Sequence, residues 1–298
     1  FINKEYLSKF DKLDKTAQIK KQEPFDEMKE VVEYYPVRKT ENTENKTFLS
    51  MDWVIGDGAN QALTMKMRIL ADALVNHESG PLKLALQDSG VGRDINAYYS
   101  ANKQGVFHLN VKNANLEDKE RFHKIVDETL QRVAKEGIND DALKGIVNRY
   151  EFRLREGQHP QKGLIYLFQS RNGWAYAGDP LLSLKWEKPL KATKKAVKKD
   201  QLETLIEDKF LNNSHSLLIA LAPKPGLQAK WDKQTEKELA EFKASLSGKE
   251  MDSLMKQTEE LIAYQKRENS PEDLAKMPLL ELEEIDTTAA YFDIEEKD

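Results

Sequence analysis

Residues 95–111 have the sequence INAYYSANKQGVFHLNV, which decides the expected fold class. Apolar and aromatic residues concentrate in 95–99 and 106–111, and the turn between them is short and contains Gly105. Two such runs joined by a turn of this length predict a β-hairpin. Because hairpin strands are antiparallel, we expect an antiparallel or mixed sheet rather than a purely parallel one.

A further strand and several helices are expected around this hairpin. Residues 47–55 alternate, and one side of the predicted strand carries Thr47, Leu49, Met51, Trp53 and Ile55. Apolar residues at helical spacing predict helices within 63–74, 82–87, 122–133, 143–154 and 201–210, with a last strand at 217–222. Gly137 and Asn139 suit a helix end and the next helix start. Helices packed on a mostly antiparallel sheet give an α+β fold.

Two segments have weaker patterns. Residues 4–32 are rich in Lys and Glu and predict weak helix, broken by Pro24 and by the pair at 35–36. Before the Gly-Asp-Pro turn at 178–180, Trp174 and Tyr176 flank Ala175, so we expect both rings to point one way, into the core.

The composition changes after Pro225-Gly226, which divides the chain into expected domains 1–225 and 226–298. Residues 235–269 contain no Pro and abundant Glu, Lys, Leu and Met. The pairs Thr235/Glu238 and Ser247/Glu250 have capping-box spacing, so each predicts a helix start. We therefore expect a helical hairpin turning at 247–248, with apolar stripes long enough to pack together: Leu239, Phe242 and Leu246, then Met251, Leu254 and Leu261.

Composition also limits the function. The 298 residues carry 46 Lys and Arg against 51 Asp and Glu, a net charge of −5 that argues against nucleic-acid binding. No apolar run reaches the roughly 18 residues of a membrane span. The absence of cysteine is typical of a reducing compartment, such as cytoplasm or an organelle matrix, and leaves a periplasm open. Because the chain starts at Phe1 without Met or a signal peptide, we expect part of a longer protein.

Local motifs for catalysis are lacking. No two of His77, His108, His123, His159 and His215 are four residues apart, so no helix offers a two-His zinc pair. The histidines are expected at surface or packing positions. No nucleotide-binding glycine loop and no nucleophile elbow occurs. Lysines between 185 and 199 favour a solvated helix face over a surface for acidic peptide or nucleic acid.

Six motifs in order resemble those of one peptidase family. They are QEPF (22–25) with YP (35–36), GPLKLAL (80–86) with SGVG (89–92), EFRLRE (151–156), GWAYAGDPL (173–181), NNSH (212–215), and LIAYQ (261–265) with MPLLEL (277–282). Their order resembles the second domain and following hairpin of presequence-type peptidases in the pitrilysin/insulinase family. The match covers nearly the whole chain.

The resemblance implies a clamshell of two halves joined by a helical hairpin. In such enzymes the first domain binds zinc through an H-x-x-E-H helix and a distal Glu, and the motif Glu acts as general base. This chain resembles the second domain and hairpin, so the resemblance implies no metal ligand, catalytic residue or cofactor here, and zinc in the parent protein. Implied partners are the remaining domains of the same polypeptide and an unfolded peptide substrate, without nucleic acid or membrane.

Within this resemblance, residues 68–72 are similar to the zinc-binding helix in degenerate form. Arg68 and Asp72 take the places of the two His ligands, and Ala71 takes that of the general base. Arginine is a permanent cation and cannot ligate zinc. The resemblance also implies that the chain walls the peptide chamber and hinges the halves, with Gly226 and Pro271 expected as flexible points. The alternative is a stand-alone scaffold or interaction protein with a degenerate peptidase fold.

Overall fold

The structure, a computed structural model, describes residues 2–11, 19–157, 160–199, 201–277, 279 and 281–284. The chain forms two compact units, Phe1–Ala229 and Lys230–Asp298. The division between these units falls inside helix α9, Leu227–Ser245, whereas the domain boundary that we expected lies just before this helix.

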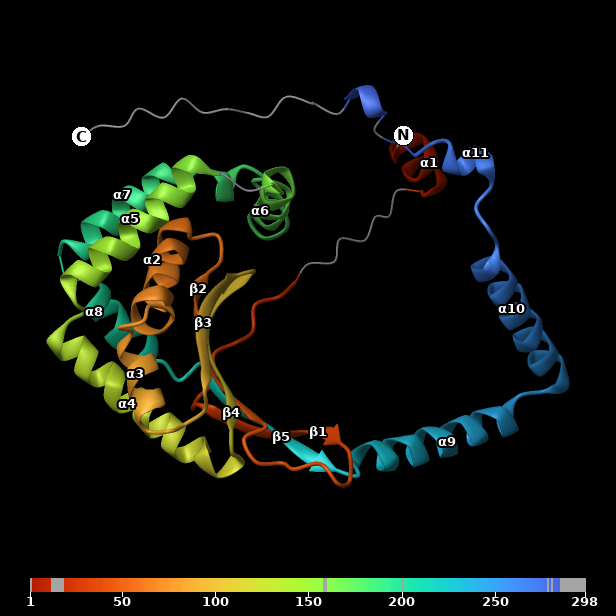
Figure 1. Cartoon of the computed structure of the whole chain (residues 1–298), viewed down its shortest axis with the longest axis horizontal. Helices are drawn as coiled ribbons and strands as arrows, with labels where there is room; N and C mark the ends of the chain where they lie inside the picture. The colour runs from red at the N-terminus through yellow and green to blue at the C-terminus, as the bar shows by residue number, and fades with distance from the viewer. Residues whose placement is uncertain are drawn as a thin grey trace. The chain divides into compact units, whose positions relative to one another are not determined.

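The first unit contains a five-stranded mixed sheet (Figure 1). Its strands lie in the order β1-β5-β2-β4-β3. They are β1 (Lys29–Val37), β2 (Thr47–Asp57), β3 (Asp94–Ala101), β4 (Gln104–Ala114) and β5 (Ser216–Pro225). All neighbours are antiparallel except β1 and β5, which run parallel. The expected hairpin is β3–β4, and the α+β fold class is confirmed.

Strand β1 corrects the prediction of weak helix through residue 32. Valine and tyrosine dominate residues 31–35, and β-branched and aromatic residues fit a pleated surface better than a helix. Pro36 was expected to break structure, but it lies within β1 opposite Lys224. A proline is tolerated here because β1 is an edge strand.

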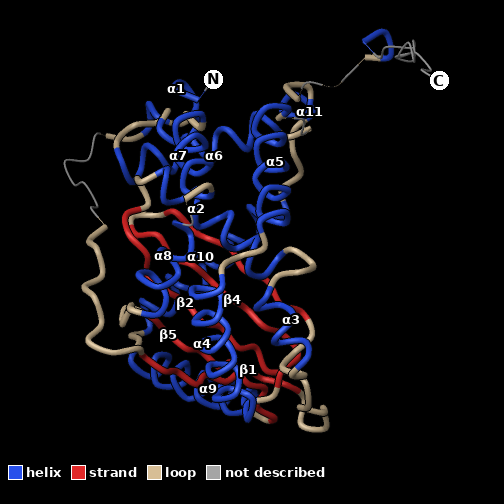
Figure 2. The backbone as a smooth tube through the Cα atoms, turned by 90° about the vertical axis from the view of Figure 1, so that its left-hand side faces the viewer, coloured by secondary structure: helices blue, strands red, loops and turns tan. Residues whose placement is uncertain are grey.

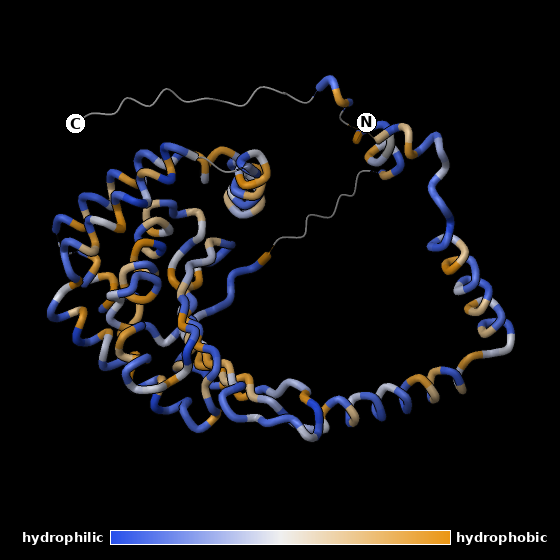
Figure 3. The backbone as a smooth tube through the Cα atoms, viewed as in Figure 1, coloured by the Kyte–Doolittle hydropathy of each residue, from blue (hydrophilic) through white to orange (hydrophobic). Residues whose placement is uncertain are grey.

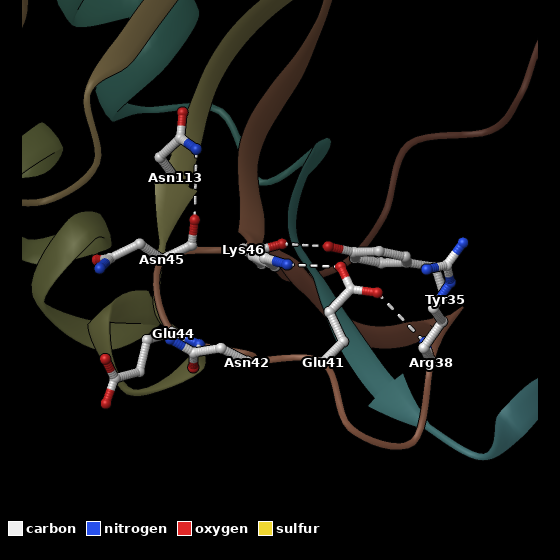
Figure 4. Close-up of polar contacts among 8 residues, drawn as sticks. All are labelled: Tyr35, Arg38, Glu41, Asn42, Glu44, Asn45, Lys46 and Asn113. Atoms are coloured by element: carbon white, nitrogen blue, oxygen red, sulfur yellow. Dashed lines mark hydrogen bonds and ion pairs between the residues drawn. The ribbon is translucent and has the colours of Figure 1, made fainter.

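The loop from β1 to β2 is held by polar contacts (Figure 4). The Tyr35 hydroxyl donates to the Lys46 carbonyl at 2.6 Å. The Lys46 ammonium lies 2.5 Å from Glu41 Oε1, and the backbone N–H of Arg38 donates to Glu41 Oε2 at 3.3 Å. The hydrogen bond from Lys46, ahead of the one from Arg38, lowers the pKa of Glu41. These contacts fix the loop between two strands that are not neighbours in the sheet.

Helices cover one face of this sheet (Figures 1 and 2). They are α2 (Gln61–Ala71), α3 (Pro81–Asp88), α4 (Lys119–Glu136), α5 (Asp140–Glu156), α7 (Glu187–Val197) and α8 (Gln201–Ile206). The predicted alternation of β2 is confirmed, since Leu49 and Trp53 are buried. Trp53, Phe107 and Phe210 make edge contacts at the core, with Phe107 and Phe210 centroids 4.8 Å apart. The opposite sheet face exposes Phe48 and Tyr98.

The predicted helix ends are also present. Gly137 ends α4 with φ 87°, a conformation that suits glycine. The Asn139 side chain accepts the Ala142 N–H at 2.9 Å and starts α5. Two π-helical turns, Asp72–Asn76 and Glu207–Leu211, extend α2 and α8.

Helix α6, Lys162–Ala177, corrects the expectation for Trp174 and Tyr176. Residues two apart diverge on a helix, whereas the expectation required both rings to point the same way. Trp174 is 68% exposed, so its predicted core packing is wrong, while Tyr176 is half-buried. Apolar residues occur along much of α6 (Figure 3), and the only one of its residues to be buried is Gly173.

The second unit contains most of α9, α10 (Gly248–Lys266) and the short α11 (Pro271–Leu274). The capping box at α10 is confirmed: Glu250 Oε2 accepts the Ser247 N–H at 2.8 Å, and Ser247 Oγ accepts the Glu250 N–H at 3.4 Å. The predicted helix start at Thr235 is wrong, because α9 begins at Leu227. Good helix formers such as Leu, Gln, Ala and Lys occupy 227–234 and extend the helix upstream.

The apolar stripes of α9 and α10 remain open. Leu239, Phe242, Leu254 and Leu261 are 61%, 53%, 43% and 55% exposed. No residue of these two fully described helices is buried, so tertiary packing adds little to their stability. Among the described residues, no helix combines the length and hydropathy that a membrane span requires.

Candidate functional site

Arg68, Ala71 and Asp72 lie at the end of α2. Asn60 starts this helix by accepting the Leu63 N–H at 3.0 Å. Arg68 and Asp72 are four residues apart and share a helix face, where Arg68 is exposed and Asp72 half-buried. Ala71 points elsewhere and is 2% exposed, so a longer side chain has no room there.

Asp72 already has partners. Asn76 Nδ2 donates to Asp72 Oδ1 at 3.0 Å and to the Ala97 carbonyl at 2.8 Å, which ties the helix end to β3. Arg149 Nη2 of α5 lies 3.8 Å from Asp72 Oδ2. This place therefore brings together one carboxylate and two cations, Arg68 and Arg149. Such a set does not fit a zinc ion, because arginine has no lone pair for a metal.

The described histidines are dispersed. His77 and His123 are half-buried at separate places, and His159 lies outside the described residues. Within the described ranges, no group of three or more His, Asp or Glu side chains is arranged to hold a metal ion.

Three strands bring Asp52, His108 and Ser100 together on the open face of the sheet. Asp52 Oδ1 lies 2.5 Å from His108 Nδ1, and His108 Nε2 lies 3.2 Å from Ser100 Oγ. Tyr98 stacks on the imidazole with ring centroids 4.4 Å apart. Sequence reasoning missed this set because it depends on the pairing of Asp52 and Tyr98 with His108 across β2, β3 and β4.

The order carboxylate–imidazole–hydroxyl matches that of a nucleophilic triad. Such a triad also needs N–H donors aimed at the developing oxyanion. His108 lies on β4, whose backbone pairs with strands on both sides. We therefore interpret the three side chains as a polar cross-strand network that satisfies His108.

His215, expected at a surface or packing position, is 6% exposed and packs edge-on against Phe25, with centroids 4.6 Å apart. Its Nε2 has no hydrogen-bond partner among the described residues. Burial, and secondarily the charge of Lys29, lowers the pKa of His215. The packing prediction is confirmed for this residue.

A cavity of about 850 Å³ lies between α2, α5, α6 and residues 182–189. Its walls include Thr64 and Arg68 of α2, Arg153 of α5, and Lys162 and Tyr166 of α6. The Thr64 side chain is buried, and its Oγ1 has no partner among the described residues. No sequence pattern indicated this cavity, since α6 was not predicted.

The lysines between 185 and 199 lie on and before α7. The helix buries Leu190, Thr193 and Ala196 and exposes residues 188, 191 and 195. Lys194 pairs with Glu151, and Lys185 lies 3.3 Å from Asp179. This arrangement is the solvated face that the spacing predicts.

The two expected flexible points differ in conformation. Gly226 has φ +79° between β5 and α9, in a region that other residues rarely adopt. Pro271 is the first residue of α11, and Ser270 caps that helix by accepting the Asp273 N–H at 3.1 Å.

Comparison with known families identifies the chain. The family described as peptidase M16 inactive domain matches residues 2–150, and a second family, described as associated with the C branch of the M16 peptidases, matches residues 221–298. The chain belongs to the peptidase M16 family. The resemblance found in the sequence is confirmed.

Curated relatives place this M16 chain beside presequence proteases. Protein HypA of Clostridium perfringens is 35% identical over 301 residues, which cover 100% of this chain and 31% of HypA. Presequence protease 1, chloroplastic/mitochondrial, of Arabidopsis thaliana is 29% identical over 96% of this chain and 28% of that protein. The chain thus spans less than a third of the length of these two relatives.

Solved structures share the fold of the M16 chain. A protease from Helicobacter pylori matches with a TM-score of 0.55 over 74% of this chain and 50% of that chain, at 15% identity. An inactive peptidase domain from Bordetella parapertussis matches with a TM-score of 0.50 over 63% of this chain and 97% of that chain, at 13% identity. The chain is therefore a non-catalytic M16 domain with its associated helical segment, similar to part of a presequence protease.

Proposed function

We propose that this chain is the non-catalytic wall and hinge of a zinc metallopeptidase that degrades unfolded peptides. The observation that carries the proposal is the alignment of 96% of the chain with 28% of a presequence protease. The cation pair at Arg68 and Arg149 adds support, since a metal would have to be bound elsewhere in the same polypeptide. The remaining domains of that polypeptide are then its partners.

The wall function is assigned to the uncovered face of the sheet. Helices cover one face only, and the other carries half-buried and exposed residues such as Phe48, Tyr98 and His108. A surface with aromatic and polar groups offers both apolar contact and hydrogen bonds to an unfolded peptide. Closure of such a wall around the peptide would exclude water and retain the substrate.

The hinge function is assigned to the two ends of the helical segment, at Gly226 and Pro271. Hinges are few residues that absorb large changes of φ and ψ. Gly226 is suited to this because it lacks a Cβ and adopts φ +79°. Proline cannot adopt that φ, so the informative substitution is Gly226→Ala, which disfavours the observed conformation without removing an N–H.

The test uses the full-length protein that contains this chain. The proposal predicts an upstream domain with an H-x-x-E-H helix, and Gly226→Ala is expected to slow turnover of long peptides while zinc content stays unchanged. Small-angle scattering should show an altered mixture of open and closed forms. The matched control is Gly248→Ala, since Gly248 has an ordinary φ and open space around its Cα. A gene with a start codon directly before this chain and no zinc domain would instead support the scaffold.

A further inference from the structure

The cavity beside α2 has an uneven distribution of charge. Four cations line it, from α2, α5, α6 and the following segment: Arg68, Arg153, Lys162 and Lys185. Glu156 is the one acidic residue among the lining residues. Opposite charges attract more strongly in a partly enclosed site than in open water. The cavity therefore favours a ligand that carries negative charge.

Two of these cations are available to a ligand. Lys185 pairs with Asp179, and the Lys162 ammonium lies 5.6 Å from the centre of the Tyr166 ring. Neither Arg68 nor Arg153 forms an ion pair with any residue that the structure describes. Arginine binds carboxylates through two parallel N–H donors, which gives both strength and orientation. A carboxylate is thus the group that these side chains suit.

The walls also carry apolar and neutral polar groups. Met65, Ile165 and Tyr166 supply apolar surface, and Ile165 and Tyr166 are 36% and 41% exposed. Gln169 and Asn172 line the same space with amides that can both donate and accept hydrogen bonds. The unpartnered Thr64 Oγ1 adds a buried group that lacks its hydrogen bond. Backbone amides of a peptide match this mixture of donors and acceptors.

We propose that this cavity binds a short acidic peptide segment. Its carboxylate pairs with Arg68 and Arg153, its backbone bonds to Thr64 and the amide side chains, and an adjacent apolar side chain packs on Ile165 and Tyr166. The volume of about 850 Å³ lies within the range of pockets that enclose small ligands. The choice of a peptide rests on the proposed function, whereas the preference for acidic residues rests on the cavity alone.

Binding is tested on the 298-residue chain by fluorescence anisotropy. The probe is a labelled hexapeptide that alternates glutamate with leucine or phenylalanine, and the reference replaces each glutamate with lysine. We expect the acidic peptide to bind at least tenfold more tightly at low salt, with affinity falling as salt rises. Equal binding of the two peptides, or no binding of either, would overturn the proposal.

Two variants locate the site. Arg68→Ser with Arg153→Ser is expected to weaken binding about tenfold or more, because it removes charge-assisted hydrogen bonds. The matched control is Arg132→Ser with Lys135→Ser on exposed positions of α4, which changes net charge equally and should leave most of the affinity. If the control weakens binding as much as the double arginine variant, the attraction is general and the cavity is not the site.

Thr64→Val keeps the test independent of misfolding. Valine has the shape of threonine without the unpartnered hydroxyl, so the free chain should be as stable as before or more stable. We expect peptide affinity to fall severalfold while the thermal midpoint holds or rises. Unchanged affinity with a folded chain would contradict the assigned contact. Because none of these measurements uses peptidase activity, their failure leaves the wall-and-hinge proposal standing, and failure of that proposal leaves them unaffected.

Discussion

Arg149 Nη2 lies 3.8 Å from Asp72 Oδ2, across the contact between α5 and the end of α2. The two side chains are 48% and 23% exposed, so the pair contributes at most about 1 kcal/mol to stability. Its importance is positional. The pair shows that a side chain from α5 reaches the place where the resemblance puts the second of two zinc-binding histidines.

That geometry makes it possible to restore a metal site. We expect Arg68→His, Asp72→His and Arg149→Glu together to create a zinc site from two histidines four residues apart and a carboxylate on the facing helix. Ala71 stays unchanged because its side chain is buried. Isothermal titration should detect about one zinc per chain in the triple variant, with tetrahedral N/O ligation in X-ray absorption.

The control keeps Arg149 and changes only Arg68 and Asp72 to histidine. It should bind zinc much more weakly, because a cation remains beside the two imidazoles. If the triple variant folds but takes up no more zinc than this control, the assignment of Arg68 and Asp72 to the positions of zinc ligands is wrong.

Hydrogen exchange should separate the two units. Amides in residues 235–266 are expected to exchange before those of 217–222, because α9 and α10 bury no residue whereas Leu218 and Ala220 of β5 are fully buried. Mass spectrometry of the exchanged chain measures both segments in one experiment. Equal or greater protection in the helical segment would mean that its apolar stripes are covered in solution.

His215 is expected to make stability depend on pH. Its folded pKa is lowered, while the unfolded chain has an ordinary histidine pKa of about 6.5. Below that pH the unfolded state takes up a proton that the folded state resists, so the free energy of unfolding falls as pH drops through the folded pKa. His215→Phe, of similar size, should remove this component between pH 7.5 and 5.5 in urea titrations. An imidazole pKa at or above the ordinary value, measured by NMR, would contradict the burial argument.

Two glycine-to-alanine changes should have opposite signs. A Cβ at Gly105 would meet Tyr99 Oη at 1.6 Å and the Ile55 carbonyl oxygen at 2.7 Å. Tyr99 is fixed there by donating to that carbonyl at 2.6 Å, so Gly105→Ala should destabilise the sheet by about 1–3 kcal/mol. Gly145→Ala in α5 meets no atom within 4 Å and should stabilise by about 0.5–1 kcal/mol. Denaturant unfolding measures both, and a stabilised Gly105→Ala would show that the hairpin is looser than described.

Much of the fold follows from local patterns. Thr47, Leu49, Met51, Trp53 and Ile55 alternate in sequence and are all buried in the structure. Elements whose packing depends on distant residues were harder to predict. Strand β1 forms through parallel pairing with β5, about 190 residues later along the chain, and its charged neighbours conceal it. Helix α6 lacks an amphipathic pattern, because apolar residues occur on several of its sides.

The candidate sites divide in the same way. The helix face shared by Arg68 and Asp72 follows from their spacing, but the approach of Arg149 needs the packing of α5 on α2. The Asp52–His108–Ser100 network needs the register of three strands. The acidic-peptide cavity needs both α6 and the loop after it. Residues far apart in sequence and joined only by tertiary structure leave no local signal.

The most direct test of the central claim is zinc content, measured by mass spectrometry of metals on the 298-residue chain and on the full-length protein after identical dialysis. The account predicts no stoichiometric zinc in the chain and one zinc per full-length polypeptide, with peptidase activity only in the latter. Tightly bound zinc with peptidase activity in the chain itself, or a full-length protein without zinc, would contradict it.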